Sequence, residues 1–124
     1  GKINLEYRKL MLAYPENDSL FRHASFEMAQ LHNDNEEYDD AEKEYYAYYR
    51  MWPESDNAEK AMFSRGFILN ENLKKDSLAL EVFREFIAKS PNSELKESAE
   101  WLAKNIESNG KLSEDLLKKI ESEQ

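Results

Sequence analysis

The sequence contains two matched stretches, AEKEYYAYYRMWP over residues 41–53 and ALEVFREFIAKSP over residues 79–91. Each begins with alanine, carries an aromatic residue four positions later, and ends at a proline twelve positions after the alanine. Residues four positions apart lie on one face of a helix, and proline cannot continue a helix. Each stretch therefore predicts a helix that ends just before its proline, and the match between them predicts an internal repeat.

The three prolines give the length of this repeat. Pro15, Pro53 and Pro91 are each separated from the next by 38 residues. A polar pair follows each proline: Glu16-Asn17, Glu54-Ser55 or Asn92-Ser93. The second residue of each pair, Asn or Ser, can cap the start of a helix. The repeating unit is therefore predicted to be a helix, a proline turn, a second helix and a short loop.

Extended along the chain, this pattern predicts an all-α fold of seven helices. Their expected ranges are about 2–14, 17–33, 36–51, 55–72, 76–89, 93–108 and 113–123. Ser113 is the predicted N-cap of the last helix, after a break at Gly110. We expect one domain over residues 1–124, with a leading helix over 1–14 and repeats over about 15–52, 53–90 and 91–124. The leading helix has the spacing of a second helix, so it predicts that the module was cut from a longer array.

Composition supports a helical, surface-rich domain and excludes several function classes. Charged residues make up 35% of the 124 residues, and there are only three glycines and three prolines, too few for a sheet with regular turns. The net charge of −9 disfavours nucleic-acid binding and docking on anionic lipid. The chain has no cysteine, which excludes disulfides, thiolate catalysis and zinc–thiolate sites. No run approaches the ~20 apolar residues of a membrane span.

Small and aromatic residues recur at fixed places in the two central units. Each unit carries a small residue, a second small residue, an aromatic residue and a proline: Ala29, Ala41, Tyr45 and Pro53, then Gly66, Ala79, Phe83 and Pro91. Small residues let two helices approach closely, and the aromatic ring fills the adjoining groove. This series resembles the tetratricopeptide repeat. The usual period is about 34 residues, so this repeat is longer, by about one turn of the first helix.

The longer form narrows the resemblance to one group within the family. The segment Pro53-Glu-Ser55-Asp-Asn-Ala58-Glu-Lys-Ala61 is similar to that of BamD-like and YbgF-like envelope proteins. The third unit departs from the pattern, because Lys104 replaces its small residue. The resemblance implies an α-α superhelix that acts as a scaffold in a bacterial envelope protein. It also implies a periplasmic or outer-membrane-associated lipoprotein of outer-membrane assembly or cell-envelope type, while a cytoplasmic location stays open.

The first helices of such repeats usually line a concave face, which is where we expect a partner to bind. The candidate partner-binding residues occupy corresponding places in the three first helices: His23, Phe26, Gln30, Lys60, Phe63, Phe67, Trp101 and Asn105. They would form an aromatic floor for an extended peptide or a partner helix. The alternative is that the aromatic side chains pack against the neighbouring second helix as part of the core. The small number of cations disfavours the co-chaperone role of gripping a C-terminal carboxylate.

Two further clusters have a structural and a functional interpretation. The aromatic run over residues 44–52 belongs either to a central helix of the stack or to an interface. The second cluster is acidic: Asp34, Glu36, Glu37, Asp39, Asp40, Glu42 and Glu44. Much of it falls in the first turn of a helix, where the macrodipole favours negative charge. A basic partner is the alternative, and calcium is a poorer one because the EF-hand glycine is missing.

The sequence predicts no catalytic residues, metal or cofactor. His23 and His32 are nine residues apart, so they do not share a helix face at ligand spacing. No Gly-rich phosphate loop and no nucleophile–base set is present. We therefore expect a non-catalytic module that binds a protein or peptide. Self-association into a homo-oligomer and an intracellular regulatory adaptor are the competing predictions.

Overall fold

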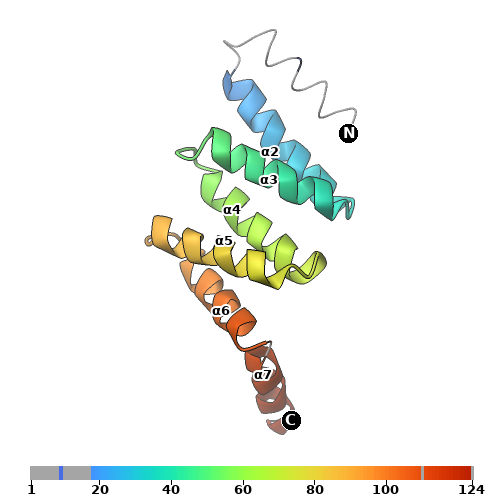
Figure 1. The fold of residues 1–124 in the computed structure, drawn as a ribbon, viewed down its shortest axis with the longest axis vertical. Helices are drawn as coiled ribbons and strands as arrows, with labels where there is room; N and C mark the ends of the chain where they lie inside the picture. Colours follow the sequence, from blue (N-terminus) through green and yellow to red (C-terminus); the bar gives the residue numbers. More distant parts are fainter. Residues whose placement is uncertain (1–8, 10–17, 110, 124) are drawn as a thin grey trace.

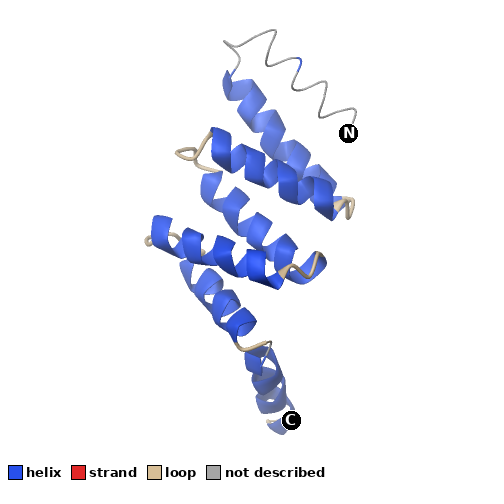
Figure 2. Ribbon diagram, in the orientation of Figure 1, coloured by secondary structure: helices blue, strands red, loops and turns tan. Residues whose placement is uncertain are grey.

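The computed structural model describes Lys9, residues 18–109 and residues 111–123. Within these residues the chain forms α2 (Asp18–Asp34), α3 (Tyr38–Met51), α4 (Ala58–Phe67), the π-helical turn η2 (Ile68–Asn72), α5 (Asp76–Lys89), α6 (Lys96–Glu107) and α7 (Lys111–Ser122). This part of the chain contains helices and loops but no strand (Figure 2). The predicted all-α fold class is therefore confirmed.

The helices pack in the order in which they occur in the chain. The most extensive contacts join α2 with α3, α3 with α4, α4 with α5, and α5 with α6. The result is an elongated stack that leads from α2 to α7 (Figure 1). Helix α7 packs only lightly against α6, and it continues beyond the end of α6 instead of folding back along it as α3 does on α2 (Figure 1).

Helix α4 joins the two halves of the core because it is buried on two sides. Ala61 and Ile68 belong to a cluster with α2 and α3, whereas Met62 and Leu69 belong to a cluster with α5 and α6. These adjacent residues point to different sides because successive helical positions are about 100° apart. Helix α4 and its π turn therefore fix the position of one helix pair against the other.

The predicted close approach of small and aromatic residues is present in the second pair. A Cβ atom added to Gly66 would lie 2.8 Å from Cε1 of Phe83, a distance that is too short for carbon atoms. The side chain of Phe83 is fully buried, so the ring has no free space to move into. Glycine at position 66 therefore allows the ring of α5 to lie directly against the backbone of α4.

The three loops that follow α2, η2 and α6 share one backbone feature. Each is three residues long, and its middle residue, Glu36, Lys74 or Asn109, has a positive φ of 61°, 56° or 55° respectively. Such left-handed residues commonly end helices, and glycine or asparagine adopts them at the lowest cost. The same turn therefore recurs at equivalent points of the chain, although the residue that forms it differs each time.

Several predicted helix ends are wrong by about three residues. Helices α4 and α6 begin at Ala58 and Lys96 rather than at 55 and 93. Ser55 does not cap α4, because its hydroxyl donates to the carbonyl of Trp52 at 2.9 Å. The hydroxyl of Ser93 accepts from the backbone N–H of Leu95 at 3.1 Å, in the turn that precedes α6. Both serines therefore stabilise a proline turn ahead of the helix.

Two other predictions concern the ends of the chain. Ser113 is not an N-cap, because α7 begins at Lys111 and position 113 lies inside the helix. The predicted helix over residues 2–14 lies outside the described residues, apart from Lys9, whose backbone is helical. The predicted cap Asn17 also lies outside them.

Candidate functional site

A groove with a volume of about 660 Å³ lies across the first helices α2 and α4 and the turn before α6. Its walls come from α2, α3 and α4 and from the segments that precede α4 and α6: Phe26, Gln30, Tyr45, Asp56, Glu59, Lys60, Phe63, Ser64, Asn92, Ser93, Glu94 and Leu95. The volume is within the range of about 300–1,000 Å³ that is typical of ligand sites. The groove brings several of the predicted binding residues together in one concave site.

The floor of the groove is aromatic, and the same rings belong to the core. The ring of Phe26 lies 5.8 Å from the ring of Tyr45, edge to face. The ring of Phe63 lies 5.7 Å from that of Phe83 and 5.9 Å from that of Phe86. Phe26 and Phe63 therefore pack against the second helices, and each also lines the groove. The packing interpretation is therefore confirmed for both phenylalanines, while binding of a partner at these rings stays a prediction.

Tyr45 brings a polar group to the floor of the groove. Its side chain is buried, and its hydroxyl hydrogen-bonds with the side chain of Ser64 on α4. Burial raises the pKa of Tyr45 above its ordinary value of 10.0, while the bond to Ser64 opposes this rise. The hydroxyl is therefore neutral near pH 7 and links α3 to α4 beneath the groove.

The rim of the groove is predominantly acidic. Three of its side chains are carboxylates, Asp56, Glu59 and Glu94, and Lys60 is the cation among the lining residues. All four are exposed, and none forms an ion pair with another residue in the described part of the chain. The rim therefore presents a negative potential around an apolar floor, together with uncharged hydrogen-bonding groups such as Gln30 and Asn92.

Half of the predicted binding residues line this groove. Phe26, Gln30, Lys60 and Phe63 do so. The other four, namely His23, Phe67, Trp101 and Asn105, are not among its lining residues. His23 is paired with Glu27 along the surface of α2, at 2.9 Å, and Phe67 and Trp101 are both exposed at 43% and 42%.

Sequence reasoning missed the part of the rim that comes from the proline turns. Asp56, Asn92 and Glu94 each lie within three residues of a proline, in segments that connect a second helix to the next first helix. Their short distance from Pro53 and Pro91 could have identified them as rim residues, because in a stack of repeated helix pairs the turns of successive pairs lie along the same edge.

The acidic cluster is partly explained by ion pairs that the sequence did not reveal. Asp39 and Asp40 lie in the first turn of α3, as predicted. Glu42 accepts from Nε of Arg65 at 2.6 Å, and Glu44 lies 2.7 Å from Nδ1 of His32. Burial raises the pKa of Glu44 above its ordinary value of 4.5, and His32 partly opposes the rise. These two carboxylates therefore connect α3 to its neighbours on both sides.

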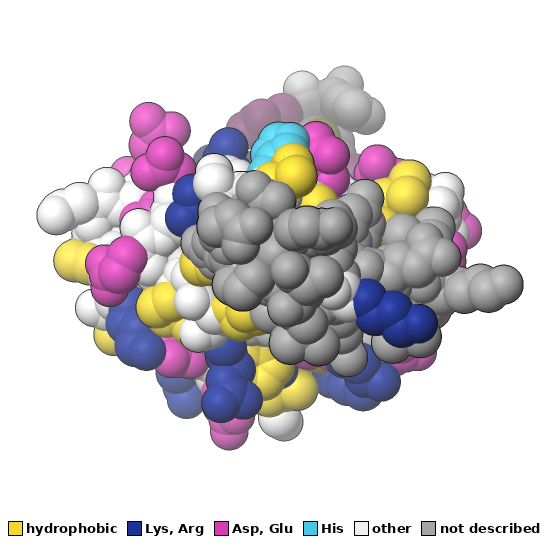
Figure 3. Space-filling model, turned by 90° about the horizontal axis from the view of Figure 1, so that it is seen from above, with side chains coloured by type: hydrophobic (Ala, Val, Ile, Leu, Met, Phe, Trp, Pro, Cys, Tyr) yellow, Lys and Arg dark blue, Asp and Glu magenta, His cyan; other side chains and the backbone are white. Residues whose placement is uncertain are grey.

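The surface and the side-chain clusters of the described residues add three observations. No group of three or more His, Asp or Glu side chains among them is arranged to hold a metal ion. No helix among them is long and apolar enough to cross a bilayer. Seen along the long axis, acidic, basic and apolar side chains are interspersed (Figure 3).

Comparison with known proteins gives no match: no family model fits the chain, and no curated protein sequence is similar to it. The resemblance to tetratricopeptide repeats therefore stays a prediction that depends on the residues quoted above.

Proposed function

We propose that this chain is a non-catalytic protein-interaction module of the tetratricopeptide-like solenoid type, and that its groove holds an extended segment of a partner protein. The observation that carries the proposal is that Phe26, Gln30, Lys60 and Phe63, which come from two successive first helices, line a single groove. A groove that is shared between repeat units suits an extended chain, because such a ligand contacts several units in turn.

The chemistry of the groove defines the preferred ligand. Its apolar floor favours an aromatic or aliphatic side chain, and its acidic rim favours a flanking Lys or Arg. The peptide would therefore carry a cationic residue beside a large apolar one. By the resemblance, we place this scaffold in a bacterial envelope protein, periplasmic or outer-membrane-associated.

A peptide-display selection tests this function. Random 12-residue peptides are selected on the protein, and the enriched peptides are then measured individually against a charge-reversed double variant, Glu59→Lys with Glu94→Lys. Both residues are exposed, so the variant keeps the core intact, unlike a change at Phe63. We expect enriched peptides to combine Lys or Arg with an aromatic or aliphatic residue, and to bind the double variant about tenfold more weakly. Each exposed charge pair contributes about 0.2–1 kcal/mol, and the reversal replaces attraction with repulsion.

The matched control is Glu81→Lys with Glu121→Lys, an equal change of charge at two exposed positions, one on α5 and one on α7, neither of which lines the groove. This control should retain wild-type affinity. Enriched peptides that bind the double variant as tightly as the wild type would contradict the proposal, as would a failure to enrich any peptide that binds.

Self-association is a second candidate function, favoured by apolar side chains that the stack leaves exposed. Trp101 on α6 and Leu116, Leu117 and Ile120 on α7 are each more than 40% exposed. Light scattering at increasing protein concentration tests it. A rise in mass that Leu117→Glu abolishes would support a homo-oligomer, and a constant monomer mass would rule it out.

A further inference from the structure

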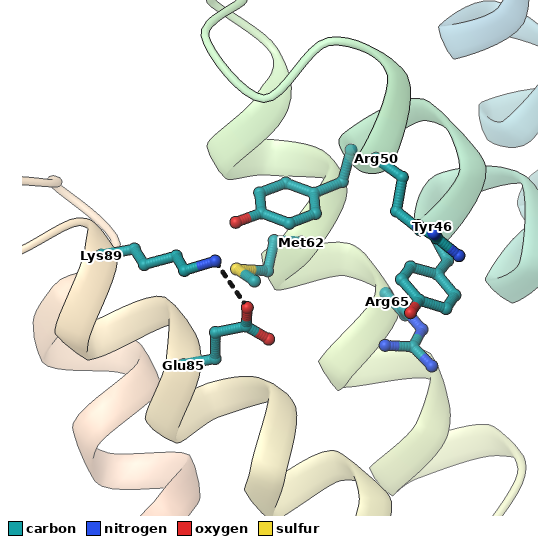
Figure 4. Close-up of a pocket in the computed structure, with 7 residues that line it drawn as sticks. Tyr46, Arg50, Met62, Arg65, Glu85 and Lys89 are labelled. Atoms are coloured by element: carbon teal, nitrogen blue, oxygen red, sulfur yellow. Dashed lines mark ion pairs between the residues drawn. The ribbon is translucent and has the colours of Figure 1, made fainter.

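A second concave site lies on the side of α4 away from the groove. Lys60, Phe63 and Ser64 of α4 line the groove, whereas Met62 and Arg65 line a cleft between α3 and α5. These two sets are on opposite faces of the helix at about 100° per residue. The cleft has a volume of about 250 Å³, and its other lining residues are Tyr46, Tyr49, Arg50, Glu85 and Lys89 (Figure 4).

The cleft gathers positive charge in an acidic protein. Arg50, Arg65 and Lys89 come from three different helices, and Glu85 is the one carboxylate among the lining residues. The chain as a whole has a net charge of −9. The charge of the cleft is therefore opposite in sign to the charge of the groove rim, which lies on the other face of α4.

Arg65 is held in place by one hydrogen bond and one ring contact within the described residues. Its Nε donates to Glu42 at 2.6 Å, and its guanidinium lies over the ring of Tyr46, 4.0 Å from the centroid. The side chain is only 15% exposed. A guanidinium has five N–H donors, so the four on the terminal nitrogens have no partner in the described part of the chain.

The other two cations are placed beside the same aromatic surface. The guanidinium of Arg50 lies 5.6 Å from the centroid of the Tyr46 ring. The ammonium of Lys89 lies 5.8 Å from that of the Tyr49 ring and 2.8 Å from Glu85. The Lys89–Glu85 pair is about half exposed and spans one helical turn, so it contributes little to stability. Lys89 can therefore turn towards a ligand at small cost.

We propose that this cleft binds an oxyanion, a phosphate or carboxylate group, carried by a side chain of a partner protein. Planar guanidinium groups bind such oxygens with two parallel hydrogen bonds. Met62 and the two tyrosine rings add an apolar wall. Since a cavity of about 150 Å³ accommodates benzene, a cleft of about 250 Å³ has room for an aromatic ring that bears the anion.

A purely structural role does not account for this arrangement. Glu42 occupies one donor of Arg65, and a structural ion pair needs no further cation. Arg50 makes no ion pair with another described residue, yet its guanidinium lies on the same ring as that of Arg65. Glu42 balances the charge of one of the two guanidinium groups on this ring, so the charge of Arg50 is left for an anion to neutralise.

The test uses phenyl phosphate as the probe, with phenol as its uncharged counterpart of similar shape. The arginine Nε–Hε signals of the protein are followed by NMR at constant ionic strength. We expect saturable shifts of Arg50 and Arg65 with phenyl phosphate and none with phenol. Arg50→Gln and Lys89→Gln should each weaken binding several-fold, and Arg65→Lys by about tenfold, because lysine lacks the fork that makes paired hydrogen bonds.

Arg84→Gln is the matched control, since Arg84 is an exposed cation on α5 that pairs with Glu107 and does not line the cleft. It should leave binding unchanged. The proposal is overturned if Arg84→Gln weakens binding as much as Arg50→Gln, or if neither phenyl phosphate nor benzoate causes saturable shifts. If benzoate binds as tightly as phenyl phosphate, the natural group is a carboxylate; if phenyl phosphate binds much more tightly, it is a phosphorylated side chain.

Discussion

The two central helix pairs, α2 with α3 and α4 with α5, have the same register but different interiors. The fourth residue of each second helix is a fully buried alanine, Ala41 or Ala79, and a buried aromatic residue follows four positions later, Tyr45 or Phe83. In the second pair the contact is apolar, with Phe83 against Gly66 and Phe63. In the first pair, the equivalent Tyr45 reaches Ser64 of the next helix with its hydroxyl.

The first pair also contains the buried polar side chains. Among the described residues, His32 on α2 and Glu42 on α3 are the charged or polar side chains that are buried. Helix α3 contributes Tyr45 to the groove and Tyr46, Tyr49 and Arg50 to the cleft. The register of small and aromatic residues therefore fixes how the helices pair, while the remaining positions determine which side chains line the groove and the cleft.

The largest expected effect comes from exchanging the two aromatic residues. Phe83→Tyr adds a hydroxyl to Cζ of the ring. This carbon lies so close to the backbone of Gly66 that a Cβ atom added there would be 3.0 Å from it. We expect a loss of about 2–4 kcal/mol in the free energy of unfolding, from overpacking and from an unpaired buried hydroxyl. Tyr45→Phe loses one hydrogen bond and should cost about 1 kcal/mol or less. Urea unfolding followed by circular dichroism measures both, and equal costs would contradict the difference between the interiors.

Gly66→Ala is the next largest change. The new Cβ would overlap the Phe83 ring at 2.8 Å, and the better helix propensity of alanine offsets only part of that strain, so we expect a net loss of about 1–2 kcal/mol. Combining it with Phe83→Leu should cost less than the sum of the single changes, because the smaller side chain relieves the overlap. Strictly additive costs would show that the two residues do not interact.

The sequence was sufficient to predict the helices, because they depend on local spacing. The ranges 36–51 and 76–89 agree with α3 and α5 to within two residues, since alanine, aromatic and proline mark both ends of each helix. The starts of α4 and α6 were placed three residues early, because Ser55 and Ser93 are good caps by type but are used in the proline turns.

The candidate sites were harder to predict, because they depend on how helices cross. Phe26 and Phe63 were found from their equivalent positions in successive first helices. The Glu42–Arg65 pair joins residues 23 positions apart, and no local pattern distinguishes Glu42 from the other carboxylates of its cluster. The cleft was missed for the same reason, since the aromatic run over 44–52 indicates a central helix but not which tyrosines remain on its surface.

The three loops give a smaller, stabilising effect. Glu36→Gly and Lys74→Gly remove a side chain from a left-handed position, and we expect each to raise the free energy of unfolding by about 0.5–1 kcal/mol. Asn109→Gly should gain less, because asparagine tolerates this conformation. Glu81→Gly, inside α5, is the control and should lose about 1 kcal/mol. A loss of stability in both loop variants would show that these turns are not equivalent helix ends.

The smallest effect is a pH dependence that only the first pair should show. Burial raises the pKa of Glu44 above 4.5 in the folded chain, and the bond to His32 limits the rise. At a pH between the ordinary pKa of 4.5, which holds in the unfolded chain, and the raised pKa of the folded chain, only the folded chain keeps the proton of Glu44. The contribution of Glu44 to stability is therefore full below pH 4.5 and falls as the pH rises through the raised pKa. The stability of the wild type relative to Glu44→Gln should therefore decrease as the pH rises from below 4.5 through the raised pKa. Unfolding curves for the two proteins over this range measure the difference, with Glu81→Gln correcting for the loss of one surface charge. A difference that instead grows with pH would mean that pairing with His32 outweighs burial, which would make the polar interior of the first pair a net source of stability at neutral pH.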